Sequence, residues 1–215
     1  AEAIRDAKVA ALSKLSVVLS EDCVIGQYDG YHKEPEVARN SETETFVAFK
    51  TQVNTSRWKD VPWYIKTGKK LDKKYAEVNL VLKPQKDLFG HADSNVISIR
   101  LGPKQEGIAL RASAKKPATI QELHPITLEF CYKCEFGPNS AEAYERLLQD
   151  ILAGDQTRFA RWDEVRESWK FTDALIKAAK KSPLESYVPG SSGPRTANTL
   201  LKSRSWVQVD RKFTI

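Results

Sequence analysis

The order of the periodic segments constrains the fold of this chain more than any other feature. Alternation of apolar and polar residues, which is typical of strands, recurs through the first part of the sequence. Turn-forming Gly, Pro, Asn and Asp separate these segments, and most neighbouring pairs have no helical pattern between them. The expected strands are 22–28, 45–53, 61–66, 76–83, 95–101, 107–114 and 125–136.

Helical periodicity appears at residues 2–15 and again after the strands. We expect one later helix over residues 140–153, capped by Ser140, and another over residues 163–180. Strands in sequence followed by helices favour an α+β fold, with a large, mainly antiparallel sheet and helices packed on one face. The side chains of the last helix expected to face the core are Val165, Trp169, Leu175 and Ile176.

Composition limits the class of protein. A chain of 215 residues with 41% hydrophobic residues can bury a substantial core, so we expect residues 1–215 to form a single domain. The formal charge of +6 is mildly basic and falls short of a nucleic-acid-binding arm. No apolar run approaches the ~20 residues that span a bilayer, so no membrane association is expected.

The chain has three cysteines, Cys23, Cys131 and Cys134. An odd number in a chain of this size favours reduced thiols and a cytoplasmic location. Cys131 and Cys134 form a C-x-x-C within the expected strand 125–136, where alternation would direct them to opposite faces. No second pair completes a zinc site, so no metal is expected.

Residues for catalysis are not evident. A Gly-x-Gly-x-x-Gly turn and a Walker loop are both absent from the sequence. His32, His91 and His124 have no carboxylate at a spacing that would orient them, and the solvated-loop interpretation is preferred for each. We therefore expect no catalytic residue in this chain.

A dense group of lysines connects two expected strands, 61–66 and 76–83. Because like charges held close together repel, an anion is the natural partner for this group. Thr67-Gly68 forms a small turn that lets the backbone and a lysine approach a ligand, and a lysine suits a phosphate as a compact point charge. The lysines are Lys66, Lys69, Lys70, Lys73 and Lys74.

A series of motifs extends along almost the whole chain. The motifs are residues 25–31 (IGQYDGY), 43–46 (TETF), 57–62 (RWKDVP), 67–71 (TGKKL), 142–148 (EAYERLL), 154–157 (GDQT), 161–165 (RWDEV) and 187–194 (YVPGSSGP). In this order they resemble the C-terminal domain of glucose 6-phosphate dehydrogenase. The resemblance implies a domain whose sheet supports a homodimer, or a higher even oligomer, and forms one wall of the sugar-phosphate pocket.

The resemblance also implies a function. It indicates the C-terminal, substrate-binding and dimerisation part of an NADP-dependent oxidoreductase of the pentose phosphate pathway, which oxidises glucose 6-phosphate to 6-phosphogluconolactone. Lys69 corresponds to the lysine that binds the substrate phosphate, and Lys74 to a second basic substrate contact. The coenzyme domain and the catalytic histidine precede this segment in the family, so we expect the isolated chain to be inactive.

Some family members carry a second, structural NADP on this domain. Arg100, Arg111 and Glu129 fit the residues that hold it, but Tyr75, Asn79, Ala109 and Ser192 stand where basic or aromatic contacts are needed. We therefore expect no cofactor on this chain. The alternative function is a basic polyanion-binding or nucleic-acid-binding module, favoured by the net charge and by Trp58, Trp63 and Tyr64 beside the lysines.

Overall fold

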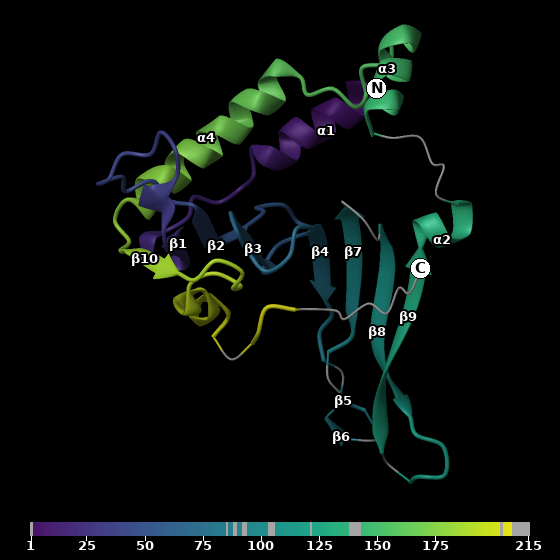
Figure 1. The fold of residues 1–215 in the computed structure, drawn as a ribbon. Coiled ribbons are helices and arrows are strands. Elements are labelled where there is room, and N and C mark those ends of the chain that lie inside the picture. The colour runs from purple at the N-terminus through teal and green to yellow at the C-terminus, as the bar shows by residue number, and fades with distance from the viewer. Residues whose placement is uncertain are drawn as a thin grey trace. The chain divides into compact units, whose positions relative to one another are not determined.

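A computed structural model describes residues 2–84, 86–87, 90–91, 94–102, 106–120, 122–137, 143–202 and 204–207 (Figure 1). Contacts between residues divide the chain into two compact units. The first unit combines residues 1–73 with residues 143–206, and the second combines residues 74–142 with residues 207–215. That residues 1–215 form a single domain stays a prediction.

The first unit contains a four-stranded sheet in the order β10-β1-β2-β3. Its strands are β1 (Cys23–Tyr28), β2 (Phe46–Gln52), β3 (Pro62–Gly68) and β10 (Leu184–Tyr187). β1, β2 and β3 pair antiparallel, whereas β10 pairs parallel to β1. The short β10 was not predicted, and it brings distant sequence beside the first strand.

Helices cover one face of this sheet. α1 (Glu2–Leu12) and α4 (Trp162–Ala179) run side by side, and the C-terminal half of α4 lies against the sheet (Figure 1). Leu175 and Ala179 of α4 are buried in one cluster with Ile25 and Phe49. The prediction that Trp169 faces the core was wrong, because its side chain is 59% exposed.

The opposite face of the same sheet has a core of its own. Tyr28, Phe46 and Ala48 point to this side, since successive residues of a strand alternate between faces. They pack with Tyr187 and with a 3-10 helix, η3 (Arg195–Leu201). Burial on both faces explains why β1 and β2 read as nearly continuous apolar segments.

The second unit contains a four-stranded antiparallel sheet in the order β4-β7-β8-β9. Its strands are β4 (Ala76–Val81), β7 (Val96–Gly102), β8 (Gly107–Lys115) and β9 (Leu123–Cys131). A two-stranded pair, β5 (Lys86–Asp87) and β6 (Gly90–His91), belongs to the same unit. The prediction of an α+β fold with mainly antiparallel pairing is confirmed, although the described strands form two four-stranded sheets rather than one larger sheet.

One face of the second sheet is apolar and exposed. Cross-strand register aligns Val78 with Ile99, Ile108 and Phe130 in one row across all four strands. The next row on this face aligns other apolar side chains. Its members are Leu80, Ile97, Leu110 and Leu128.

Several residues of these rows remain open to solvent. Ile108 is 47% exposed, Phe130 is 41% exposed and Leu128 is 59% exposed. On the other face Ser98 is 0% exposed and Ala109 is 1% exposed. Val96, at 1% exposure, is also buried on this other face. Exposed apolar rows of this kind are unusual on a monomer and are typical of surfaces that a partner covers.

The C-terminal end of β9 differs from the prediction. The expected strand 125–136 ends at Cys131, and residues Tyr132–Phe136 form the short helix α2. The rings of Tyr132 and Phe136 lie 4.8 Å apart, because a spacing of four residues places side chains on one face of a helix.

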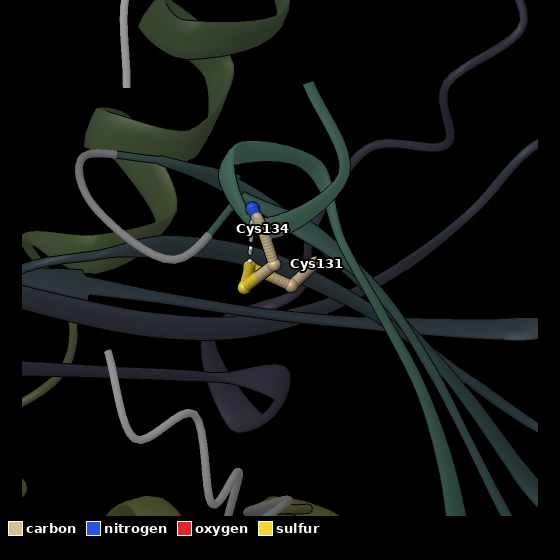
Figure 2. The surroundings of a disulfide bond; sticks show 2 residues. All are labelled: Cys131 and Cys134. Atoms are coloured by element: carbon tan, nitrogen blue, oxygen red, sulfur yellow. Dashed lines mark hydrogen bonds between the residues drawn. A yellow bond between two sulfur atoms is a disulfide. The ribbon is translucent and has the colours of Figure 1, made fainter. Parts of the chain in front are cut away.

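The prediction that Cys131 and Cys134 face opposite sides as free thiols was wrong. The two residues form a disulfide (Figure 2), and Cys23 is free and buried. The change from strand to helix after Cys131 brings the two side chains to the same side. Their Cα atoms lie 5.2 Å apart, a distance that suits a disulfide.

α3 (Ala143–Ala153) and α4 confirm the two later helices. The expected cap Ser140 lies outside the described residues. None of the described helices is both long enough and apolar enough to cross a membrane.

Candidate phosphate-binding site

The candidate site lies where β3 ends and the lysine segment begins. The backbone N–H of Lys69 donates to the carbonyl of Thr45 (2.8 Å), which extends the pairing of β2 with β3 by one residue. A side chain at Gly68 would place its Cβ 2.9 Å from the Phe46 ring and 3.2 Å from the Thr45 carbonyl oxygen. Glycine therefore lets the backbone before Lys69 lie directly on β2.

Tyr187 of β10 holds the carbonyl side of Lys69. Its hydroxyl lies 2.8 Å from the Lys69 carbonyl oxygen and 3.0 Å from the Thr45 hydroxyl. Because a tyrosine hydroxyl has one proton to donate, the shorter contact favours donation to Lys69. Tyr187 is 4% exposed, and burial raises the pKa of its hydroxyl, which keeps the donor protonated.

A second loop supports the residues that follow Lys69. The backbone N–H of Gly190 donates to the Lys70 carbonyl (2.8 Å), and that of Asp72 donates to the Ser191 carbonyl (3.0 Å). Gly190 and Ser191 thus belong to the wall of the site. Gly193 has φ +98°, and a Cβ there would lie 2.3 Å from the Phe46 ring.

Lys70 is engaged by the protein itself. Its ammonium forms an ion pair with the carboxylate of Glu34 and lies 4.6 Å from the centroid of the Tyr28 ring. The hydrogen bond from Lys70 holds the pKa of Glu34 below its ordinary value. Lys70 therefore has an internal partner, although its side chain is 49% exposed.

The Lys66 ammonium also has a partner within the protein. Its ammonium lies 4.9 Å from the centroid of the Trp206 ring, and its side chain is half-buried. Burial lowers the pKa of Lys66, with the nearby Asp72 carboxylate acting in the opposite direction. A cation over an aromatic face in this position ties β3 to the segment after η3.

Lys69 differs from both neighbours. Its side chain is exposed, and within the described part of the chain it has neither an ion pair nor a hydrogen bond. The backbone of Lys69 is fixed on both sides while its ammonium stays available to a ligand. This combination of a held backbone and a free cation is what a phosphate-binding lysine requires.

Lys73 and Lys74 are exposed as well. Lys73 ends the first stretch of unit one, whereas Lys74 begins unit two. The assignment of Lys69 and Lys74 as substrate contacts stays a prediction.

The residues expected to resemble a structural NADP site are engaged with one another. The Arg100 guanidinium pairs with the Glu77 carboxylate (2.9 Å) and lies 4.8 Å from the Tyr75 ring centroid. The side chain of Glu77 is 3% exposed, and it also accepts a hydrogen bond from the Asn79 amide (3.0 Å). The charge of Arg100 is thus neutralised by a buried acid. That this chain binds no cofactor stays a prediction.

The tryptophans near the lysines pack on each other. The rings of Trp58 and Trp63 meet edge to face at 5.2 Å, and the Arg57 guanidinium lies 5.7 Å from the centroid of the Trp58 ring. Neither ring is in the exposed class. This packing removes the main support for a stacking platform, so the polyanion-binding alternative is not favoured.

Among the described residues no group of three or more His, Cys, Asp or Glu side chains could hold a metal ion. His32 lies in a 3-10 turn (Tyr31–Lys33), His91 in β6 and His124 in β9.

Comparison with known proteins gives a consistent assignment. A family model described as glucose-6-phosphate dehydrogenase, C-terminal domain, matches residues 1–208. Glucose-6-phosphate 1-dehydrogenase of Bacillus subtilis (strain 168) is 38% identical over 221 residues, which cover 93% of this chain and 45% of that protein. The cytoplasmic glucose-6-phosphate 1-dehydrogenase 5 of Arabidopsis thaliana is 34% identical, with 97% of this chain and 42% of that protein covered.

Solved structures agree with these relatives. A glucose-6-phosphate dehydrogenase in complex with its substrate glucose-6-phosphate has a TM-score of 0.85 at 30% identity, covering 97% of this chain and 46% of that one. Glucose-6-phosphate 1-dehydrogenase from Mycobacterium avium has a TM-score of 0.83 at 31% identity, covering 96% and 44%. The chain thus spans a little under half the length of these relatives.

Proposed function

Because this chain belongs to the family of glucose-6-phosphate dehydrogenase C-terminal domains, we propose that it is the C-terminal part of an enzyme that oxidises glucose 6-phosphate to 6-phosphogluconolactone. The reaction would serve the pentose phosphate pathway. A relative that carries this enzyme name and a structural neighbour that holds glucose-6-phosphate support the proposal.

The observation that carries the proposal is the environment of Lys69. Its backbone is held by Thr45 and Tyr187, and its ammonium is exposed and has no partner within the described residues. A phosphate dianion placed at this ammonium would gain a charge-assisted hydrogen bond without displacing an internal ion pair. Lys70 could gain a phosphate only by leaving Glu34.

Lys74 is proposed as the second basic contact of the sugar phosphate. Its exposed side chain can turn toward an anion without breaking a contact within the described residues. A long exposed side chain loses entropy when it is fixed, so Lys74 should contribute less than Lys69.

The coenzyme is proposed to be NADP, bound by a part of the enzyme other than this chain. When bound, NADP would accept the hydride that leaves the sugar. The chain supplies no Gly-rich nucleotide turn, and Arg100 is committed to Glu77. The role left to this chain is to bind the sugar phosphate and to support assembly, in a cytoplasmic enzyme like the Arabidopsis relative named so.

The assembly is proposed to be a homodimer formed through the outer face of the β4-β7-β8-β9 sheet. The rows that begin at Val78 and Leu80 present eight aligned apolar side chains, and Ile108, Leu128 and Phe130 among them are strongly exposed. A second copy would cover this face with an identical one, as a twofold interface requires. Burial of these side chains provides the driving force.

The enzymatic proposal is tested with the full-length protein that contains this chain. We expect NADP reduction with glucose 6-phosphate, and far lower kcat/KM with glucose, which lacks the phosphate. The isolated chain should show no turnover with either sugar. Equal kcat/KM for the two sugars, or turnover by the isolated chain, would contradict the proposal.

A further inference from the structure

The Cys131–Cys134 disulfide joins the last residue of β9 to the first turn of α2 (Figure 2). The two ends of the bond differ in access. Cys131 is 8% exposed, whereas Cys134 belongs to the exposed class. A thiol from solvent therefore reaches the Cys134 side of the bond far more readily than the Cys131 side.

The bond is placed to hold a small element rather than the whole fold. It links residues only 3 positions apart, and short loops gain least from a disulfide in the chain-entropy account. α2 has 5 residues, which is too short for a helix to persist alone. Among the described residues, its further contacts include the Tyr132 N–H bonded to the Glu106 carbonyl (3.0 Å) and the ring of Phe136 near that of Phe130 (6.3 Å).

We propose that Cys131 and Cys134 form a reversible thiol–disulfide exchange site for a low-molecular-weight thiol of the glutathione class. The small thiolate attacks Cys134 Sγ, a mixed disulfide forms there, and the electron pair of the broken bond leaves on Cys131 Sγ. A second small thiolate then attacks the sulfur of the bound small thiol and releases Cys134. Two protein thiols are gained, with protons from solvent, and two small thiols become one small disulfide.

The surroundings favour this direction of attack. The backbone N–H of Cys134 donates to Cys131 Sγ (3.1 Å), so a donor already lies at the sulfur on which negative charge develops (Figure 2). Cys131 is thus the stabilised leaving group and Cys134 the accessible target. A protein proposed to be cytoplasmic meets such thiols continuously, and disulfides there are typically transient or redox-sensing.

Reduction should release α2 from the end of β9. Without the bond, α2 keeps the backbone hydrogen bond to Glu106 and the ring contacts, which are weak supports for one turn of helix. Phe136 would then leave Phe130, which lies in the exposed apolar row of the sheet. Reduction of the disulfide would thereby alter one end of the exposed apolar face of the sheet.

Cys23 provides the internal control. It is 4% exposed, and burial raises its pKa to about 11, so it stays protonated and shielded. A Cys23→Ala variant should respond to thiols as the parent does. Retention of the response in this variant assigns the chemistry to the C-x-x-C pair.

The test exposes the full-length Cys23→Ala protein to reduced and then oxidised glutathione without denaturant, and counts thiols by alkylation and intact mass. We expect a gain of two thiols on reduction and their loss on oxidation. When Cys131→Ser is added, a mixed disulfide with glutathione should accumulate on Cys134. When Cys134→Ser is added instead, the amount of mixed disulfide on Cys131 should be lower by at least about tenfold. Hydrogen exchange of residues 132–136 should accelerate on reduction, while exchange in β1 and β2 stays unchanged.

Three results would overturn the proposal. If the disulfide is reduced only in the presence of denaturant, it is a structural bond and not an exchange site. Cys131 and Cys134 could form mixed disulfides equally, which would contradict the direction of attack. Exchange of residues 132–136 could be the same in both redox states, which would show that the bond does not hold α2.

Discussion

At the residue scale, neighbouring lysines of one segment have different tasks because their surroundings differ. Lys66 lies over Trp206, Lys70 pairs with Glu34, and Lys69 keeps a free ammonium among the described residues. The count of lysines and the Thr-Gly turn were visible in the sequence. The partners that occupy Lys66 and Lys70 come from segments far along the chain, so the sequence alone could not separate the three.

The Lys70–Glu34 pair predicts a change in one titration. Lys70→Ala should return the pKa of Glu34 toward its ordinary value, because the hydrogen bond from Lys70 is the main cause of the lowering. The pKa of Glu34 is lower in the folded protein than in the unfolded chain. The ion pair therefore stabilises the fold at pH values above the unfolded-state pKa, and this stabilisation is lost as the pH falls through the folded-state pKa. NMR titration of the Glu34 carboxyl measures this, with Lys73→Ala as the control; an unchanged titration in Lys70→Ala would contradict the pairing.

At the scale of elements, β10 supports the backbone of the lysine segment. It places Tyr187 against Lys69 and leads into the loop whose Gly190 bonds the Lys70 carbonyl. A strand of 4 residues that pairs parallel with β1 has no local signature strong enough to detect. The longer strands and both later helices were predicted because their periodicity extends over many residues.

Tyr187→Phe tests the support that β10 gives to Lys69. Loss of the hydroxyl leaves the Lys69 carbonyl without its donor and removes one partner of the buried Thr45 hydroxyl, at a cost of about 1–3 kcal/mol in the free energy of unfolding. KM for glucose 6-phosphate should also rise, because Lys69 is less well positioned. Chemical denaturation and steady-state kinetics measure the two effects, and Tyr144→Phe, at an 80% exposed residue, is the control. A destabilised variant with unchanged KM would show that Tyr187 supports the fold but not the lysine.

At the scale of the whole molecule, the α+β class followed from the order of strands and helices, whereas the split into two sheets did not. The alternation in β4, β7, β8 and β9 shows that one face is apolar, but not that the apolar face is the exposed one. The C-x-x-C was misread for a related reason. Alternation through Cys131 and Cys134 is also compatible with a strand that turns into a helix, and only three-dimensional structure distinguishes the two.

The exposed apolar face predicts a dimer that one charge can disrupt. Leu128→Asp should convert the full-length protein from dimer to monomer at micromolar concentration, because a carboxylate would have to be buried against the partner. Thr127→Asp is the matched control, since Thr127 is exposed and points to the other face of β9. Sedimentation velocity measures the oligomeric state of both variants. If the Leu128→Asp protein forms a dimer as stable as that of the parent, the interface lies elsewhere.

The central claim is that Lys69 is a shaped phosphate contact rather than one charge of a diffuse patch. KM for glucose 6-phosphate in the full-length enzyme should rise about 10- to 100-fold in Lys69→Ala, as expected for a lost charge-assisted contact of ~1.5–3 kcal/mol. Lys74→Ala should raise KM less, and Lys73→Ala should leave it within about twofold, since an exposed charge contributes little. Equal increases in all three variants, or none in Lys69→Ala, would contradict the account.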